Sequence, residues 1–504
     1  MEHHQPEETW LERAAPGDHP GHRPGGAVAG ISERPNAFFR LSPAESGKAQ
    51  CFAIQRGGIE RRADVIFHQP WVHARLAALE SARFPTEDMG QVIEVIRYGT
   101  STPPPYVEPG HESAPFVRAT DIKDGEVRLD SLLHIEAAQP KQMDKCRLSG
   151  GELIIVRSGA NTGDCAVVPN SLAGAYAAYD LILTFRATAQ ALFIAMFLDT
   201  EAGRLQLNLV RGRAAQPHVN AEEVSALRVP LPPPKIQERL ITAMETARAE
   251  RRAKLAEADA LLAGLDDYLL ATLGLTPPPK DERRVFAVST SALGSQARLN
   301  ADYFHPERIL AIRALADTTQ QLDCPRLEQV VDFIRDQIKM PGLNYLSLAN
   351  VQSNTGELVP TNEEVTGACS IFQRGDVLFA RLRPYLNKVH VAEKDGCCSP
   401  EFHVLRVKNN ETLHPDYLAP ILRSSLTLAQ TRHMMTGNTH PRLTNEDVVN
   451  LVIPVPKPTI QEAIAVEASR RREEARRLRT EAEAGWKAAK RWFEEQLLGP
   501  VQPR

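Results

Sequence analysis

The stretch Pro230-Leu-Pro-Pro-Pro-Lys-Ile-Gln-Glu-Arg-Leu-Ile241 organises this sequence because the chain repeats it. It returns 224 residues later as Pro454-Val-Pro-Lys-Pro-Thr-Ile-Gln-Glu-Ala-Ile-Ala465, with three prolines and the Ile-Gln-Glu triplet in matched positions. Each copy follows a segment rich in β-branched residues and opens a long charged segment with helical spacing. The sequence therefore predicts a strand-rich module, a stiff proline hinge and a helix, and then the same three parts again.

A second pair of segments keeps the same offset. Gly151-Glu-Leu-Ile-Ile-Val-Arg157 matches Gly375-Asp-Val-Leu-Phe-Ala-Arg381, and each is typical of a turn followed by an apolar strand that ends on an arginine. A repeat of this length is too long for a solenoid and indicates a duplicated module with pseudo-twofold symmetry within one chain. Further strands are expected at 92–99, 115–122, 181–186 and 402–407, and helical stretches at 192–209 and 417–433.

The two charged segments carry apolar residues at alternating steps of three and four, which is the spacing of a coiled-coil seam. The first helix should run from Lys235 to about Thr272, or about 57 Å at about 1.5 Å per residue. Neither seam is apolar enough to stand alone in water, so each helix needs the other. The predicted seams are Leu255, Ala258, Leu262, Leu265 and Leu269 in the first helix, and Ile464, Ala468, Arg471, Ala475, Leu478, Ala482 and Gly485 in the second.

The composition limits the protein class. The chain has 504 residues with 42% hydrophobic and 24% charged, and no apolar run long enough for a membrane span. No secretory signal is visible, and seven scattered cysteines are typical of reduced thiols, so we expect a cytoplasmic protein. A net charge of −4 confines any nucleic-acid site to a local patch. Residues 1–36, rich in Pro, Gly, His and Glu, are predicted to be a disordered tail.

Motifs for catalysis are missing. Thr102-Pro-Pro-Pro-Tyr106 lacks the Asn or Asp that an adenine methyltransferase places before its two prolines. No phosphate-binding Gly-Lys loop is present, and no glycine-rich loop follows a strand as an adenosyl cofactor would need. Asp121-Ile-Lys123 could be the end of a nuclease core, but the second half has Asn350-Val-Gln352 in its place. We therefore expect a non-catalytic chain with no cofactor and no metal site.

The loops that follow the matched strands differ between the halves, as expected of one scaffold that presents two recognition surfaces. Arginine suits guanine or a phosphate, and Tyr, Asn and Lys suit bases and backbone. Taken singly, each such residue is more often a solvated loop residue, but the set in both halves favours DNA contact. The candidates are Arg157, Ser158, Asn161, Thr162, Arg211, Arg213 and His218 in the first half, and Arg381, Arg383, Tyr385, Lys388, Asn438, Thr439 and Arg442 in the second.

The repeated hinge and strand segments, together with Tyr98-Gly99 and Leu299-Asn-Ala-Asp-Tyr-Phe-His-Pro306, make the chain resemble the specificity subunits of Type I restriction–modification systems. The resemblance covers most of the chain beyond about residue 37. It implies two target recognition domains that each read half of a split double-stranded DNA site. It also implies a pair of helices that separates these domains and docks two methyltransferase subunits, with restriction and translocase subunits joining for cleavage.

The resemblance gives an α+β fold with two pseudo-twofold-related α/β target recognition domains separated by two long antiparallel coiled-coil helices. The domains are expected at 37–229 and 281–453, and the hinges with their spacer helices at 230–280 and 454–504. Because the second half lacks the Tyr-Gly-Thr stretch of residues 98–100, its recognition surface should be built differently there.

Two other function classes remain open from the sequence. One is an enzyme, such as a stand-alone nuclease or methyltransferase, against which the missing motifs argue. The other is a coiled-coil adaptor, or a stand-alone DNA- or RNA-binding protein of a defence system without a nuclease partner. Duplex DNA competing against single strands and RNA would separate these classes.

Overall fold

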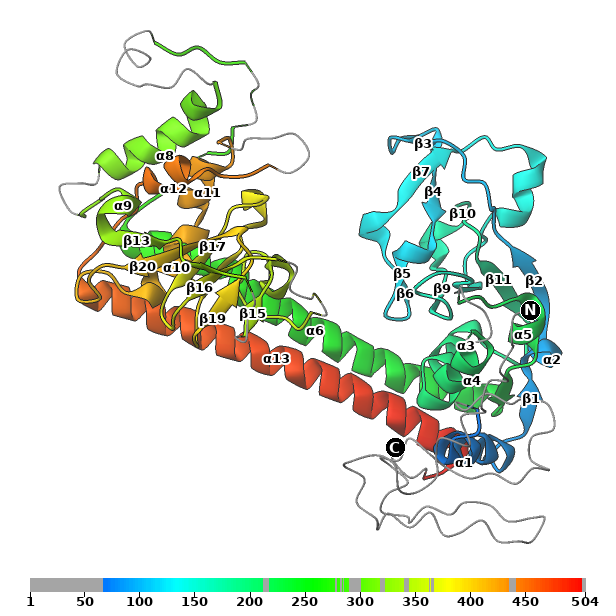
Figure 1. The fold of residues 1–504 in the computed structure, drawn as a ribbon. Helices are drawn as coiled ribbons and strands as arrows, with labels where there is room; N and C mark the ends of the chain where they lie inside the picture. The colour runs from blue at the N-terminus through cyan, green and yellow to red at the C-terminus, as the bar shows by residue number, and fades with distance from the viewer. Residues whose placement is uncertain are drawn as a thin grey trace, which may run out of the picture. The chain divides into compact units, whose positions relative to one another are not determined.

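The computed structural model of the chain describes residues 67–211, 217–276, 279–281, 283, 285–289, 301–317, 322–339, 344–361, 363, 367–434 and 441–500 (Figure 1). The tail expected at 1–36 lies outside these residues. The chain divides into two compact units, residues 1–249 with 484–504 and residues 250–483, and both boundaries fall inside the two long helices. Helices and sheets occur in both units, so the α+β class is confirmed.

Unit 1 contains two four-stranded sheets. The first has the order β2-β11-β8-β9 and is antiparallel throughout, and the second has the order β10-β4-β7-β3 with β10 and β4 parallel. Two short pairs, β1-β12 and β5-β6, complete the strands. The elements are α1 (Pro70–Glu80), β1 (Thr86–Asp88), α2 (Met89–Val92), β2 (Ile93–Tyr98), β3 (Tyr106–Val107), β4 (Ser113–Val117), β5 (Ile122–Lys123), β6 (Glu126–Val127), β7 (Leu133–Glu136), β8 (Leu153–Ile155), β9 (Cys165–Val167), β10 (Tyr176–Ala177), β11 (Leu181–Phe185), α3 (Ala191–Leu198), α4 (Glu201–Arg211), α5 (Ala221–Ser225) and β12 (Arg228–Pro230).

Unit 2 also contains two four-stranded sheets. The first has the order β13-β20-β17-β18 and is antiparallel, and the second has the order β14-β16-β19-β15 with β15 and β19 parallel. The elements are α8 (Pro306–Asp317), α9 (Leu327–Val330), β13 (Val331–Ile334), β14 (Gln337–Ile338), β15 (Tyr345–Leu346), β16 (Cys369–Phe372), β17 (Val377–Ala380), β18 (Val389–Val391), β19 (Gly396–Cys398), β20 (Phe402–Val407), α10 (Pro415–Arg423), α11 (Ser425–Thr431) and α12 (Asn445–Val449).

The first sheets of the two units have the same strand order. In each, the first strand pairs with the last, the last with a central strand, and the central strand with the one that follows it. The central strands β8 and β17 start 224 residues apart, as do β9 and β18, so the sequence repeat is also a structural repeat. The second sheets differ more, because unit 1 has only the isolated bridge Arg147↔Tyr176 where unit 2 has β16 paired with β19.

The central strands are buried on both faces, which explains their unbroken apolar sequences. Leu153 and Ile155 join the cluster that packs under α3, whereas Ile154 joins a second cluster on the other side of the sheet. In β17, Val377 and Phe379 join one hydrophobic cluster, and Leu378 joins another on the opposite face of the sheet. Successive side chains of a strand point to opposite faces, so both faces of each sheet need a cover.

The Gly-acid pair before each central strand forms the same turn. Gly151 and Gly375 adopt left-handed backbone φ values of +83° and +89°, which glycine tolerates without strain. The acid that follows accepts a hydrogen bond from the backbone N–H three residues earlier, at 2.8 Å for both Glu152 and Asp376. An arginine of the same sheet then neutralises each carboxylate, Arg97 of β2 in unit 1 and Arg406 of β20 in unit 2.

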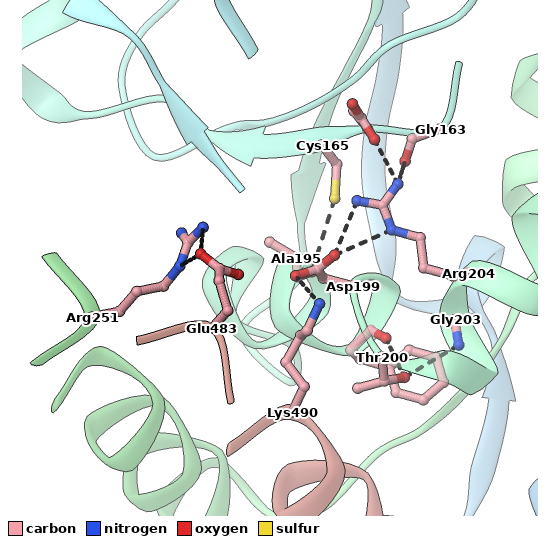
Figure 2. A network of polar contacts seen from close by, with 12 residues as sticks. Gly163, Cys165, Ala195, Asp199, Thr200, Gly203, Arg204, Arg251, Glu483 and Lys490 are labelled. Carbon is pink, nitrogen blue, oxygen red and sulfur yellow. Dashed lines mark hydrogen bonds and ion pairs between the residues drawn. The ribbon is translucent and has the colours of Figure 1, made fainter. Parts of the chain in front are cut away.

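Each helical stretch predicted after the last strand is two helices. The helical stretch predicted at 192–209 is divided, because the chain breaks at Asp199 and Thr200 between α3 and α4. The Thr200 hydroxyl donates to Phe197 O and accepts from the N–H of Gly203, which caps the new helix. Asp199 also pairs with Arg204 of α4 and with Lys490 of α13 (Figure 2).

The second predicted helix, at 417–433, breaks in the same way. Ser424 separates α10 from α11, donates to Ile421 O and accepts from the N–H of Thr427. The three residues that make these contacts stand 224 residues after their counterparts in unit 1. A hydroxyl at each break therefore fixes the turn between the two helices in both units.

The long helices are α6 (Pro234–Leu273) and α13 (Pro458–Leu498). Within unit 2 they run antiparallel, since Arg251 pairs with Glu483 (Figure 2) and Lys254 with Glu481. Ala258 packs in one cluster with Ala475 and Leu478, as the small seam residues predict.

Two predicted seam positions of α13, Arg471 and Gly485, carry no buried apolar side chain. Arg471 is half-buried and donates to Gly264 O at 2.7 Å, so this polar seam residue makes a helix–helix hydrogen bond. Gly485 is exposed, contrary to the prediction, and its neighbour Trp486 is buried instead, with Arg248 over its ring. Phe493 of α13 lies against Phe193 of α3 in the core of unit 1.

The repeated Ile-Gln-Glu triplet owes its role to its glutamine. Gln237 is fully buried at the first turn of α6, where its amide donates to Thr188 O and Pro232 O and its oxygen accepts from the N–H of Gln190. Gln461 repeats these contacts with Thr412 O, Pro456 O and the N–H of His414. All six distances are 2.8–2.9 Å, so each glutamine ties its hinge to the loop before α3 or α10.

We predict that Gln237→Ala lowers the free energy of unfolding of unit 1 by about 2–4 kcal/mol, because truncation leaves three buried backbone groups without partners. Gln461→Ala should do the same for unit 2. Urea titrations followed by fluorescence and circular dichroism would measure both.

The neighbouring exposed residues supply matched controls. Glu238→Ala and Glu462→Ala should change the free energy of unfolding by less than about 0.5 kcal/mol. Each buried glutamine with its three hydrogen bonds is called the clamp below. Equal effects of the glutamine and glutamate variants would contradict its stabilising role.

Candidate nucleic-acid interface

In each unit the loop after the central strand pairs with the loop before the last short helix. Antiparallel bridges join Ser158 to His218 and Leu382 to Arg442. The hydrogen bond from Val219 N to Arg157 O measures 2.9 Å, and its counterpart from Leu443 N to Arg381 O measures 3.0 Å. All these positions keep the offset of 224, so the structure brings together the two loops that the sequence singled out separately. We call them the unit 1 tip (157–163 with 217–219) and the unit 2 tip (381–388 with 441–443).

Arg157 is fixed between two tyrosine rings in the unit 1 tip. Its guanidinium lies 4.8 Å from the ring centre of Tyr98 and 4.3 Å from that of Tyr179. Its Nε and Nη2 both reach Nε2 of His218, at 3.1 and 2.9 Å, so this ring nitrogen is the acceptor. Stacking and hydrogen bonding thus preorganise a cationic group whose conformational entropy is already lost.

A cavity of about 600 Å³ opens beside this stacked arginine. Its lining includes Tyr98, Gly99, Thr100, Lys145 and the Tyr179 ring. Aromatic faces next to cations suit the bases and phosphates of a nucleic acid. Sequence reasoning missed Tyr179 and Lys145, which lie outside the divergent loops, and quoted Tyr98 only for its resemblance.

The other predicted residues of the unit 1 tip fall into two groups. Ser158 and Asn161 are exposed, as a contact surface requires. Thr162 differs from the prediction, because its side chain is buried and its hydroxyl donates to Gly159 O and Pro217 O. This threonine holds the loop closed and does not face outward. Arg204 of α4 reinforces the loop end through Gly163 O (Figure 2).

The unit 2 tip presents a different set of side chains. Arg383 and Tyr385 are exposed, and Arg383 has a left-handed backbone φ of +49° that directs the chain into a short turn. Lys388 is half-buried and donates to Leu348 O at 2.7 Å, so it ties the tip to the segment around Leu348. Burial lowers the pKa of this lysine.

Two arginines of the unit 2 tip lie around Glu401. Arg442 forms a bidentate ion pair with its carboxylate, with nitrogen–oxygen distances down to 2.6 Å. Arg381 is half-buried, its backbone N–H donates to Glu401 O, and its Nη1 reaches Pro400 O at 3.5 Å. Within the described residues, no tyrosine pair lies over Arg381 as one does over Arg157, so the side chains around the two arginines differ.

Four predicted contacts have no described side chain. Arg213, Asn438 and Thr439 lie outside the described residues. For Arg211, at the end of α4, only the backbone is described. Their proposed roles stay predictions.

One cluster in unit 2 has the residue types of a metal site. His305, Glu307 and His433 offer ligand atoms within 4.8 Å of one another. The Glu307 carboxylate is already engaged, by Arg432 at 2.8 Å and by His433 at 2.8 Å, and the two imidazoles stack at 3.4 Å. His433 lies 126 residues after Glu307 in sequence, which is why sequence spacing gave no sign of the cluster. The ion pair with Arg432 already neutralises the Glu307 carboxylate, so a metal ion is not needed to explain its position.

Among the helices that the structure describes, none has the length and apolarity needed to cross a membrane.

Comparison with known proteins identifies one domain. Residues 335–466 match the family described as the Type I restriction modification DNA specificity domain. This range runs from the end of β13 into the first turns of α13 and includes the whole unit 2 tip. The resemblance seen in the sequence is thereby confirmed.

A curated relative and several solved structures are also similar to this chain. The specificity subunit of the Type I restriction enzyme EcoDI from Escherichia coli is 26% identical over 145 residues, or 27% of this chain and 31% of the relative. The chain thus aligns with about a third of the length of that curated relative. Among solved structures, the HsdS subunit from Thermoanaerobacter tengcongensis is 18% identical with a TM-score of 0.33, covering 82% of this chain and 97% of that one. The Type-I restriction-modification S subunit from M. genitalium is 11% identical with a TM-score of 0.40, covering 84% and 97%.

Asp180 lies beneath the unit 1 tip and yields a test of its electrostatics. It is buried, and its Oδ1 accepts from Arg157 N at 3.1 Å. Burial raises the pKa of this carboxyl to about 6, against the opposing effect of that hydrogen bond. Between about pH 4 and pH 6 the folded state therefore holds a proton that the unfolded chain has lost, so stability falls as pH rises through this window.

We predict that Asp180→Asn removes this fall and raises the free energy of unfolding at pH 7.5 by about 1–3 kcal/mol, with little change at pH 4. Urea titrations at pH 4, 5, 6 and 7.5 would measure the slope. Asp144→Asn, at an exposed position of the same unit, is the control and should leave the pH profile unchanged. A stability difference for Asp180→Asn that is the same at every pH would contradict the assignment.

Proposed function

Because this chain carries a Type I restriction modification DNA specificity domain at residues 335–466, we propose that it is the DNA sequence-recognition subunit of a Type I restriction–modification complex. The observation that carries this proposal is the pair of tips. One backbone arrangement occurs in both units, and the side chains that it presents differ at matched positions. A shared scaffold with different contact residues suits a reader of two different short sequences.

Each tip offers groups that can read base edges. Asn161 suits adenine, whose N6 amino group donates to the amide oxygen and whose N7 accepts from the amide nitrogen, and Arg383 suits guanine O6 and N7. Tyr385 adds an aromatic face, and the stacked Arg157 adds a fixed cation for a phosphate. We propose that the unit 1 tip reads one half-site and the unit 2 tip reads another, which makes the whole site bipartite and asymmetric.

The remaining parts of the proposal follow from the resemblance. Target recognition domains at 37–229 and 281–453 would be held apart by spacer helices at 230–280 and 454–504 that pair antiparallel. The helices would also dock two methyltransferase subunits, with restriction and translocase subunits joining the complex. The chain itself would carry no catalytic residue and work in the cytoplasm.

The direct test is to express the chain with its methyltransferase partner and sequence the methylome. The proposal expects methylated adenines within two short unlike motifs separated by a gap of fixed length. Removal of one heptad from both long helices should alter that gap, because the helices set the spacing. Methylation at one uninterrupted motif, or a gap that ignores the helix length, would favour an adaptor or a single-site binder instead.

For the unit 2 tip we predict that Arg383→Ala weakens discrimination at one base pair of one half-site by about 1–3 kcal/mol and leaves the other half-site unchanged. Arg383→Lys should recover affinity but little discrimination, because lysine keeps the charge and lacks the guanidinium fork. Binding to a set of duplexes with single base-pair changes would measure both effects.

The matched control is Arg313→Ala on α8, an exposed arginine outside both tips. It should leave the preference at every base pair intact. If Arg383→Ala and Arg313→Ala behave alike, the unit 2 tip does not read bases through this arginine.

A further inference from the structure

A basic cavity of about 920 Å³ lies within unit 2, away from the tip residues. The loop at 356–358, the segment from β18 to Lys394, α10 and the outer face of α13 enclose it. Three acidic residues contribute to its lining, Glu357, Glu393 and Asp416. Five permanent cations and a histidine outnumber them, namely Arg374, Lys394, Arg423, Arg472, Arg476 and His390.

Arg423 is the innermost of these cations. As the last residue of α10 it is only 8% exposed, and its Nη1 donates to Val389 O at 2.7 Å. Its Nη2 is buried and has no hydrogen-bond partner among the residues that the structure describes. Asn387 fixes the backbone of this arginine by donating to Arg423 O at 2.7 Å.

The chain makes room for this guanidinium with a glycine. Gly356 has a left-handed φ of +72°, and a Cβ at this position would come within 2.4 Å of Arg423 Nη1 and 2.0 Å of Val389 O. No other residue type fits there without moving both groups. The guanidinium therefore sits in a pocket built to its shape.

Arg472 of α13 brings a second guanidinium to the same cavity. Its Nε and Nη2 are buried and likewise lack a hydrogen-bond partner within the described part of the chain. Burial lowers the pKa of the Arg423 guanidinium to about 9, and the charge of Arg472 acts in the same direction. Burial also lowers the pKa of Arg472.

Glu357 attracts both arginines and is shared with others, and Asp416 and Glu393 also attract Arg472. Arg476 donates to Glu357 Oε1 at 3.4 Å, and Arg479 lies 3.9 Å from Oε2. His390 adds no negative charge, and its Nδ1 is hydrogen-bonded to Gly356 O at 3.0 Å. Two guanidiniums with three buried nitrogens that have no hydrogen-bond partner among the described residues thus line a cavity in which cations outnumber acids.

Unused guanidinium N–H groups in a buried site are unfavourable unless an acceptor meets them. A carboxylate has two oxygens in one plane, whereas a phosphate presents several acceptor oxygens in different directions and carries more charge. Two guanidiniums that approach from different elements, α10 and α13, suit the tetrahedral anion. The volume exceeds that of a single oxyanion and falls in the range of small-molecule sites.

We propose that this cavity binds the phosphate group of a small molecule, with Arg423 and Arg472 as the anchoring residues. The group can come from free inorganic phosphate or from a mononucleotide, and both share the chemistry that the two guanidiniums recognise. The site does not depend on DNA recognition, since its residues lie outside both tips.

The test is isothermal titration calorimetry on the full-length chain at constant ionic strength of about 0.15 M, so that screening is equal in every arm. Inorganic phosphate, adenosine monophosphate and acetate are titrated separately. We expect saturable binding of one phosphate per chain and at least tenfold weaker binding of acetate. Binding of the nucleotide at least tenfold tighter than free phosphate identifies a nucleotide site, and equal or weaker binding identifies a site for free phosphate.

Arg472→Met, which keeps an unbranched side chain of similar bulk without the charge, should weaken phosphate binding at least tenfold. Arg470→Met is the control, because Arg470 is exposed on the same helix and pairs with Glu467. Arg472→Lys, which keeps the charge, covers the case in which the methionine variant does not fold, and should also bind more weakly than the wild type.

Absence of saturable phosphate binding by the wild-type chain up to about 10 mM overturns the proposal. Acetate that binds as tightly as phosphate overturns the phosphate class. Wild-type affinity in a folded Arg472→Met variant shows that the anion, if bound, is held elsewhere.

Discussion

A buried glutamine at the start of each long helix ties that helix to the loop that follows the last strand of the sheet. Gln237 and Gln461 each bind three backbone groups, two of them in the loop that leads from the last strand of the sheet into the helix that covers it. The prolines around each glutamine have few conformations to lose, so the hinge is stiff before the clamp forms. The direction in which each long helix leaves its unit therefore depends on one side chain.

The clamp also explains why the repeat is strongest at the hinge. An exact set of buried acceptors and donors tolerates only a side chain with both functions at the right length, and glutamine meets that requirement. The helix breaks at Thr200 and Ser424 allow either hydroxyl, because both residues can donate to a carbonyl and accept from an N–H. The described side chains of the two tips share no such set of buried hydrogen-bond partners. The sequences of the two halves differ there.

The sequence predicted the duplicated modules, the central strands, the starts of both long helices and the end of the first, because periodicity and the offset of 224 report on local structure. It did not predict the breaks inside the covering helices, although two matched hydroxyl residues mark them. It found the tips as loops but missed Tyr179, Lys145 and Asp180, which lie outside those loops in sequence and join the site only in the folded chain. Buried Thr162 was misassigned because exposure cannot be read from a polar side chain alone.

The central strands are covered on both faces, and this has a consequence for how such a protein can change. Substitutions within β8 or β17 disturb two packed layers at once, so these segments have little freedom to vary. The exposed residues of the turns beyond them, Ser158, Asn161, Arg383 and Tyr385, border on solvent and can be exchanged without repacking the core. Under the function proposed above, a change of target preference then needs only loop replacement on an unaltered frame, one half-site at a time.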